Sequence, residues 1–118
     1  MQIVINDIPV SPNGPGGLLR MHWATRKRYN DMWKIMVRQQ ITPQNPPEGK
    51  MSVRITQNRR RRLDPDNLVA SCKPILDALV AWGLIRDDSE KYCHLEVRQT
   101  TGIYAETSIE IENYTGGE

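Results

Sequence analysis

A pair of aspartates and a second pair further along the chain are the residues whose spacing most suggests chemistry. Asp64 and Asp66 flank Pro65, which fixes its own φ and keeps the preceding residue extended. Residues two apart in an extended segment point to the same side, so the two carboxylates could form a pair of hard oxygen ligands for Mg²⁺ or Mn²⁺. The same three residues also describe a favourable helix start, with Asp64 as the N-cap, and this structural alternative stays open.

The second acidic turn contains Asp87 and Asp88. If the fold brings this turn beside Asp64 and Asp66, the carboxylates repel one another unless a cation lies among them. Convergence of the two turns would therefore predict a metal site. The candidate metal ligands are Asp64, Asp66, Asp87 and Asp88.

An amphipathic helix is predicted between the two acidic turns. Its apolar residues recur at intervals of four and three: Leu68, Cys72, Ile75, Leu79 and Trp82. Gly83 is placed to end the helix, and Pro74 is expected to kink it or to restart it after Lys73. Lys73 shares a second face with Asp66 and Asp77. It could lean toward the first acidic turn and meet a phosphate, or it could simply pair with Asp77 at i,i+4 spacing.

Basic residues are concentrated in the first half of the chain. Residues 1–63 contain twelve of the sixteen lysines and arginines and only three acidic residues, a charge of +9, whereas residues 64–118 carry −7. A basic half suits a polyanion such as DNA. Four consecutive arginines precede Asp64, and a second basic group surrounds Trp23. The candidate DNA-binding residues are Arg59, Arg60, Arg61, Arg62, Arg20, Arg26, Lys27 and Arg28.

The remaining elements must position these groups. Hydrophobic periodicity predicts a helix over 25–41 and strands over 3–5, 51–56, 92–98 and 105–112. The last two strands are expected to form a terminal hairpin, and Leu84 and Ile85 are expected to be buried and strand-like. Residues 10–17, with two prolines and three glycines, predict a loop. This loop is either plain surface or the rim of a binding groove.

These elements predict a single α/β domain of the α+β type over residues 1–118, with a small, largely antiparallel sheet and two helices packed on one face. Cys72 and Cys93 fall on apolar faces, which favours reduced core thiols over a disulfide or a zinc site. No apolar run approaches the roughly 20 residues of a membrane span, and Met1 leads straight into a strand-like segment. We therefore expect a cytoplasmic protein without a membrane partner.

The central segment resembles the RusA family of Holliday junction endonucleases, which is common in bacteria and their phages. The resemblance rests on R-R-R-R-L-D-P-D-N-L, then K-P-I-L-D-A-L and then G-L-I-R-D-D-S, and covers about residues 58–90. Elsewhere only the element order and a Pro/Asn-rich loop after the first strand agree. One departure is that the interval before the lysine is about three residues longer here, so that residues 69–71 resemble an insertion of nearly one helical turn.

The resemblance implies a small RusA-like homodimer that cuts four-way DNA junctions by two symmetric nicks in the presence of Mg²⁺. Its catalytic acids would fall on Asp64, Asp66 and Asp88, and its lysine on Lys73. We therefore expect a Mg²⁺-dependent crossover junction endodeoxyribonuclease of DNA recombination and repair, in a bacterial cell or a phage-infected host. Two other functions fit the residues: a non-catalytic DNA-binding accessory protein, or a metal-dependent nuclease for other branched or single-stranded nucleic acid.

Overall fold

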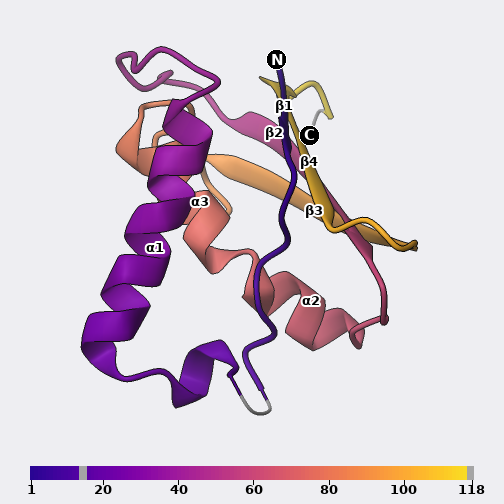
Figure 1. The fold of residues 1–118 in the computed structure, drawn as a ribbon. Helices are drawn as coiled ribbons and strands as arrows, with labels where there is room; N and C mark the ends of the chain where they lie inside the picture. The colour runs from indigo at the N-terminus through magenta and orange to yellow at the C-terminus, as the bar shows by residue number, and fades with distance from the viewer. Residues whose placement is uncertain (14–15, 117–118) are drawn as a thin grey trace.

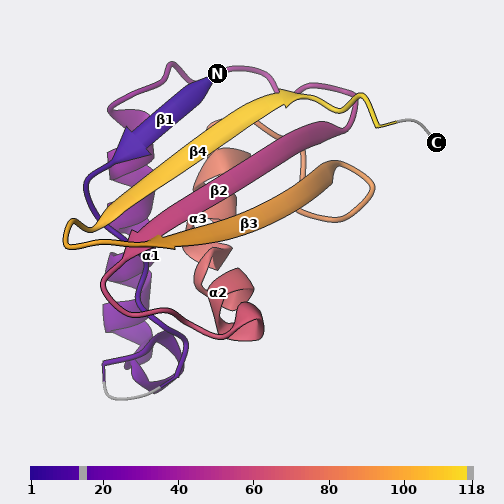
Figure 2. The same cartoon turned by 90° about the vertical axis from the view of Figure 1, so that its right-hand side faces the viewer.

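The chain forms a four-stranded sheet with its helices on one face (Figures 1 and 2). The structure is a computed structural model that describes residues 1–13 and 16–116. In chain order its elements are β1 (Gln2–Ile5), the 3-10 turn η1 (Leu18–Arg20), α1 (Trp23–Arg38), β2 (Met51–Arg59), α2 (Pro65–Ser71), α3 (Lys73–Ala81), β3 (Cys93–Thr101) and β4 (Glu106–Asn113). The predicted α+β fold class, with a mixed, largely antiparallel sheet, is confirmed.

The sheet order is β1-β4-β2-β3, so the predicted terminal hairpin is wrong. Strand β2 lies between the last two strands, parallel to β3 and antiparallel to β4 (Figure 2). The alternation of apolar residues identified both strands, but one apolar face per strand is compatible with several neighbours. Parallel neighbours need a crossover connection, and here α2 and α3 supply it. The segment with the candidate site therefore spans one face of the sheet.

The core lies between the sheet and the helices. Its completely buried apolar side chains include Ile3, Trp33, Val37, Val53, Ile55, Ile75, Leu79, Ile85 and Ile109. Helix α1 begins earlier than predicted because the side chain of His22 accepts a hydrogen bond from the Ala24 N–H and acts as N-cap. The helix also ends earlier than predicted, at Arg38. Met32 of the same helix is 39% exposed.

The predicted central helix is divided at Cys72 into α2 and α3. Pro74 lies in the first turn of α3, where its missing N–H costs least, so the predicted restart is found, beginning at Lys73 itself. Beneath the break, Gln57 is completely buried and donates to Ser71 Oγ at 3.0 Å and to Cys72 Sγ at 3.2 Å. These two hydrogen bonds hold the junction between α2 and α3 against β2.

Both cysteines are buried and free, as predicted. Burial raises the pKa of Cys72 from 9.0 to about 11. Only the thiolate is an effective nucleophile, so we expect Cys72 of the folded protein to resist alkylation by iodoacetamide at about pH 8, whereas the unfolded protein reacts. Mass spectrometry of the labelled peptides measures this, and rapid labelling of native Cys72 would contradict it.

The same pKa shift has a consequence for stability. Above pH 9 the unfolded thiol of Cys72 loses a proton that the folded thiol keeps, so its contribution to stability declines from pH 9 through about 11. In Cys72→Ala, the free energy of unfolding should fall less over this interval than in the unaltered protein. Urea denaturation at the two ends of the interval tests this difference.

The segment from 82 to 92 is a folded connection without a strand. Leu84 and Ile85 are buried as predicted, but they lie in a bend, because two adjacent apolar residues do not specify a strand. Gly83 ends α3 with a φ of +79°, as its position predicted. The carbonyl of Trp82 accepts a hydrogen bond from the Gln44 N–H at 3.1 Å, which ties this turn to the connector after α1.

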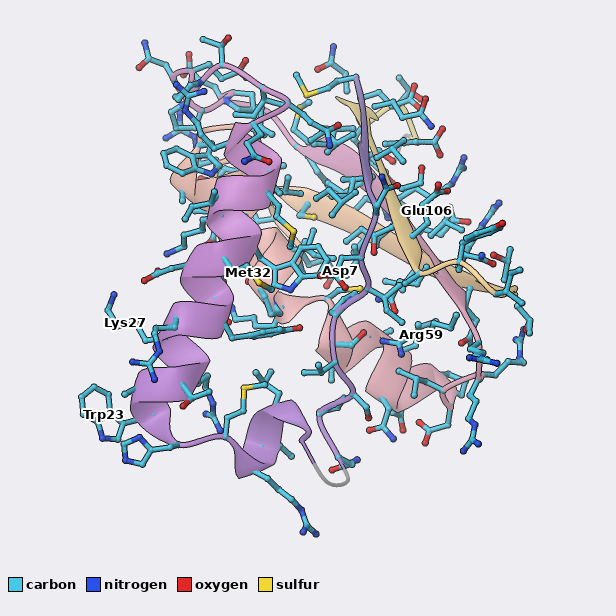
Figure 3. All side chains as sticks on the ribbon, in the orientation of Figure 1. Asp7, Trp23, Lys27, Met32, Arg59 and Glu106 are labelled. Carbon is cyan, nitrogen blue, oxygen red and sulfur yellow. The ribbon has the colours of Figure 1, made fainter. Side chains whose placement is uncertain are left out.

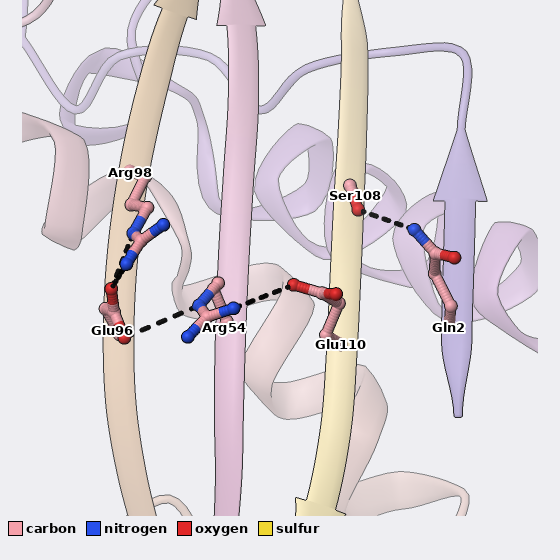
Figure 4. A network of polar contacts seen from close by, with 6 residues as sticks. All are labelled: Gln2, Arg54, Glu96, Arg98, Ser108 and Glu110. Atoms are coloured by element: carbon pink, nitrogen blue, oxygen red, sulfur yellow. Dashed lines mark hydrogen bonds and ion pairs between the residues drawn. The ribbon is translucent and has the colours of Figure 1, made fainter.

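The face of the sheet without helices is polar (Figure 4). Arg54 of β2 lies between Glu96 of β3 and Glu110 of β4, at 3.4 Å from an oxygen of each. Partly exposed pairs of this length contribute little to stability. Within residues 1–13 and 16–116, no helix combines the length and apolar character that crossing a membrane requires.

Candidate functional site

The side chain of Lys73 connects α3 to the second acidic turn. Its Nζ lies 2.8 Å from Asp88 Oδ2 and 3.1 Å from Asp77 Oδ1. Hydrogen bonds to Asp88 and then to Asp77 raise the pKa of Lys73, so the ammonium stays charged at neutral pH. The predicted pairing with Asp77 is therefore present. The side chain of Lys73 is still 59% exposed, which leaves the charge accessible to a ligand.

Asp64 is the N-cap of α2. Its Oδ1 accepts from the Asn67 backbone N–H and its Oδ2 from the Asn67 side-chain amide, both at 2.9 Å. Asp66 is exposed in the first turn of the same helix. The structural alternative raised by this sequence is thus realised. It leaves a ligand role available, because each carboxylate oxygen can accept more than one contact.

The two aspartates of the second acidic turn have different surroundings. Asp88 is turned toward Lys73, whereas Asp87 is exposed and accepts hydrogen bonds from Ser89, chiefly from its hydroxyl, which lower the pKa of Asp87. Arg86 fixes the turn by donating to the carbonyls of Pro46 and Pro47. Asp88 is therefore the member of the pair that faces the candidate site.

The structure does not bring the two acidic turns together as one ligand cluster. Within the described ranges, no three side chains of His, Cys, Asp or Glu lie close enough to hold a metal ion. Asp88 is instead paired with the ammonium of Lys73. A complete protein cage is not required for Mg²⁺, which often binds one or two carboxylates together with oxygens of a substrate phosphate. The donor types of Asp64 and Asp66 suit that mode, but no three-carboxylate site is formed among residues 1–13 and 16–116.

The arginine run divides into one buried and three exposed residues. Arg60, Arg61 and Arg62 are exposed in the turn that follows β2. The DNA-binding role predicted for Arg59 stays a prediction, but the residue is only 7% exposed. The reason is that β2 extends through Arg59, and the period-two alternation of the strand turns this residue toward the helices. The alternation of Val53, Ile55, Gln57 and Arg59 is the sequence signal for this burial.

The second basic group lies at the start of α1. Arg20, Lys27 and Arg28 are exposed, whereas Arg26 is half-buried and donates to the Leu18 carbonyl at 2.8 Å. Lys27 pairs with Asp31 at 3.0 Å. Trp23 is 73% exposed, and Figure 3 shows Trp23 and Lys27 on the outer side of α1, away from Arg59. This basic group and the turn after β2 lie on opposite sides of the view in Figure 1, so they are separate surfaces.

Two asparagines that the motif analysis did not select join the N-terminal loop to the site. Asn13 Nδ2 donates to Asn67 Oδ1 at 2.7 Å, and Asn67 in turn holds Asp64. The spacing of Asp64 and Asn67 matches an N-cap and its N3 partner, so Asn67 had a local signal. Asn13 had none, because its partner is 54 residues away in the sequence. Residues 14 and 15 of the predicted loop lie outside the described residues.

Comparison with known proteins identifies no family model and no curated protein that matches this sequence.

Proposed function

We propose that the protein is a Mg²⁺-dependent endodeoxyribonuclease that cuts branched DNA, with the four-way junction as its substrate. The observation that supports this most is the accessible ammonium of Lys73, held by Asp77 and Asp88 on the crossover segment whose α2 begins with two exposed aspartates. Three exposed arginines directly precede this segment. Cations and carboxylates in this order are the groups that phosphodiester cleavage needs.

Each group has a distinct part in the proposal. Arg60, Arg61 and Arg62 bind backbone phosphates, which makes the affinity for DNA decrease steeply with salt. Lys73 offsets the charge that develops on the scissile phosphate. The two carboxylates that hold Lys73 position this cation before DNA binds.

Asp64 and Asp66 are the residues proposed to hold Mg²⁺, or Mn²⁺ in its place, together with an oxygen of the DNA phosphate. The chemistry that such an ion supplies is stabilisation of developing negative charge and acidification of an attacking water. Asp88 is a further ligand if it exchanges its ion pair with Lys73 for the metal. Asp87 lies beside it as the alternative ligand of the same turn. Paired symmetric nicks would require a two-fold homodimer.

The test is incubation of the purified protein with a synthetic four-way junction, a three-way junction, a linear duplex and a single strand, each with and without Mg²⁺ at equal salt. We expect paired nicks in the four-way junction that depend on the metal. Preferential cleavage of another substrate would keep the nuclease but change its target. Absence of cleavage of all four substrates, with Mg²⁺ and with Mn²⁺, would overturn the proposal.

A second candidate function is a non-catalytic DNA-binding protein. It is favoured by the bonding of Asp64 as a helix cap and by the lack of a three-carboxylate cluster in the described residues. In that case, reversing the charges of Arg60, Arg61 and Arg62 would abolish junction binding, and replacing the aspartates by asparagine would change nothing measurable except the stability of α2.

A further inference from the structure

Arg59 is a buried cation without a counter-charge. Its Nε donates to Gln57 Oε1 at 2.7 Å and its Nη2 donates to the carbonyl of Pro9. Neither acceptor is charged, and no described carboxylate lies within ion-pair distance of the guanidinium. Asp7 instead accepts a hydrogen bond from the neighbouring Ile8 N–H at 2.8 Å. Burial of a charge without an opposite charge is costly, and it lowers the pKa of Arg59.

Arg59 lines a cavity that is open to solvent. This space is about 310 Å³, and its other walls come from the segment after β1: Ile8, Pro9, Val10, Ser11, Asn13, Gly16 and Gly17. No described residue accepts a hydrogen bond from Nη1 of Arg59, so this nitrogen keeps its donors for a ligand. Figure 3 shows Arg59 beside the segment that follows β1.

The walls of this cavity are held in place by bonds within the protein. Leu18 N–H donates to the Ser11 carbonyl at 2.9 Å, and Leu19 N–H donates to the Pro12 carbonyl at 3.0 Å. Val10 N–H donates to the Tyr29 hydroxyl at 2.8 Å. A Cβ on Gly17 would lie 2.6 Å from the carbonyl oxygen of Asn13, so only glycine permits this close return of the chain. The cavity is therefore a formed site in the folded protein.

We propose that this cavity binds a phosphate group, with Arg59 as its charged ligand. An arginine with free donors suits the oxygens of phosphate, and the anion would supply the missing counter-charge. The cavity also adjoins the candidate active site, because Asn13 contacts Asn67 and Asn67 holds Asp64. If the phosphate belongs to DNA, which rests on the proposed function, it is a backbone phosphate next to the cleaved strand. If it is free, it is inorganic phosphate.

Titration with sodium phosphate, exchanged against sodium chloride at constant ionic strength, tests the site independently of nuclease activity. We expect saturable changes in the ¹H–¹⁵N spectrum at the amides of Ser11, Asn13 and Gly17 and at the Arg59 Nε–H. Arg59→Met, which keeps the length of the side chain, should abolish them. Arg61→Met should leave them in place, because Arg61 is exposed in the turn outside the cavity.

Asn13→Asp is the second variant, since Asn13 is exposed and its replacement does not disturb the core. The added carboxylate at the wall of the cavity should weaken phosphate binding roughly tenfold. Thermal unfolding gives a parallel measurement: phosphate should raise the midpoint of the unaltered protein and should not raise that of Arg59→Met. Shifts scattered over the surface, or shifts that persist in Arg59→Met and in Asn13→Asp, would overturn the proposal.

A second experiment, on junction binding, identifies the source of the phosphate. Binding of a synthetic four-way junction without Mg²⁺ is compared for the unaltered protein and Arg59→Met, with Arg98→Met as the reference for loss of an exposed arginine outside the proposed DNA-binding residues. Weaker junction binding by Arg59→Met assigns the site to a DNA phosphate, and unchanged junction binding assigns it to the free anion. Phosphate binding without any nuclease activity would retain the site and refute only the nuclease, whereas junction cleavage without phosphate binding would refute only the site.

Discussion

Asp66→Asn is expected to reduce Mg²⁺-dependent cleavage of a four-way junction by roughly a thousandfold or more, while binding of the junction persists. Asp66 is exposed, and the described structure gives its carboxylate no partner among the side chains. The substitution therefore removes a negative charge and a proposed metal ligand without breaking a contact of the fold. The measurement is the single-turnover cleavage rate, together with junction affinity in the absence of Mg²⁺.

The control for this variant must distinguish loss of the proposed metal ligand from loss of an exposed negative charge at an unrelated position. Glu112→Gln neutralises an exposed carboxylate at the end of β4, away from the crossover segment, and should cleave at the unaltered rate. Asp66→Asn should also lose only the small favourable interaction of its charge with the start of α2, so its thermal midpoint should stay close to that of the unaltered protein. A folded Asp66→Asn protein that still nicks the junction would remove Asp66 from the mechanism.

Gly83→Ala is expected to destabilise the protein by about 2 to 5 kcal/mol. Gly83 has a φ of +79°, a conformation that disfavours any residue with a Cβ. An added Cβ would also lie 1.8 Å from the carbonyl oxygen of Gln44, which is backbone and cannot rotate away. The turn after α3 and the connector after α1 would have to separate, with loss of the hydrogen bond from Gln44 N–H to Trp82.

Gly49→Ala is the matched control for this substitution. A Cβ at Gly49 would meet no atom within 4 Å, and the residue is exposed. Its effect on the free energy of unfolding should be small, and in the stabilising direction if the alanine restricts only the unfolded chain. Urea denaturation of both variants provides the comparison. Equal stabilities of Gly83→Ala and Gly49→Ala would contradict the close contact between Gly83 and Gln44.

Local features of this fold could be predicted from the sequence because each depends on a few neighbouring residues. The strand alternation, the break near Pro74 and the end of α3 at Gly83 are of this kind. The position of β2 between β3 and β4 was not predictable in the same way, because the apolar faces of the three strands are interchangeable. The burial of Arg59 was predictable in principle from the strand period, but the run of four arginines obscured it.

In the candidate site, too, the local contacts could be predicted from the sequence and the long-range contacts could not. The pairing of Lys73 with Asp77 follows from helix geometry, and the cap formed by Asp64 follows from its place before a proline. The contact between Lys73 and Asp88 joins residues 15 apart, and the contact between Asn13 and Asn67 joins residues 54 apart. Such contacts depend on the path that the connecting segments take over the sheet. The spacing of residues in the sequence does not specify this path.

The position of β4 between β1 and β2 has a consequence for synthesis on the ribosome. Ile3 of β1 is paired with Ile109 of β4, and β4 is the only neighbour of β1 among the described strands. A nascent chain can assemble β2, α2, α3 and β3 as one unit, but β1 must wait until β4 has been made before the two strands can pair. Closing so long a stretch of chain is entropically costly and slow, so the pairing of β1 with β4 should be a late step of folding.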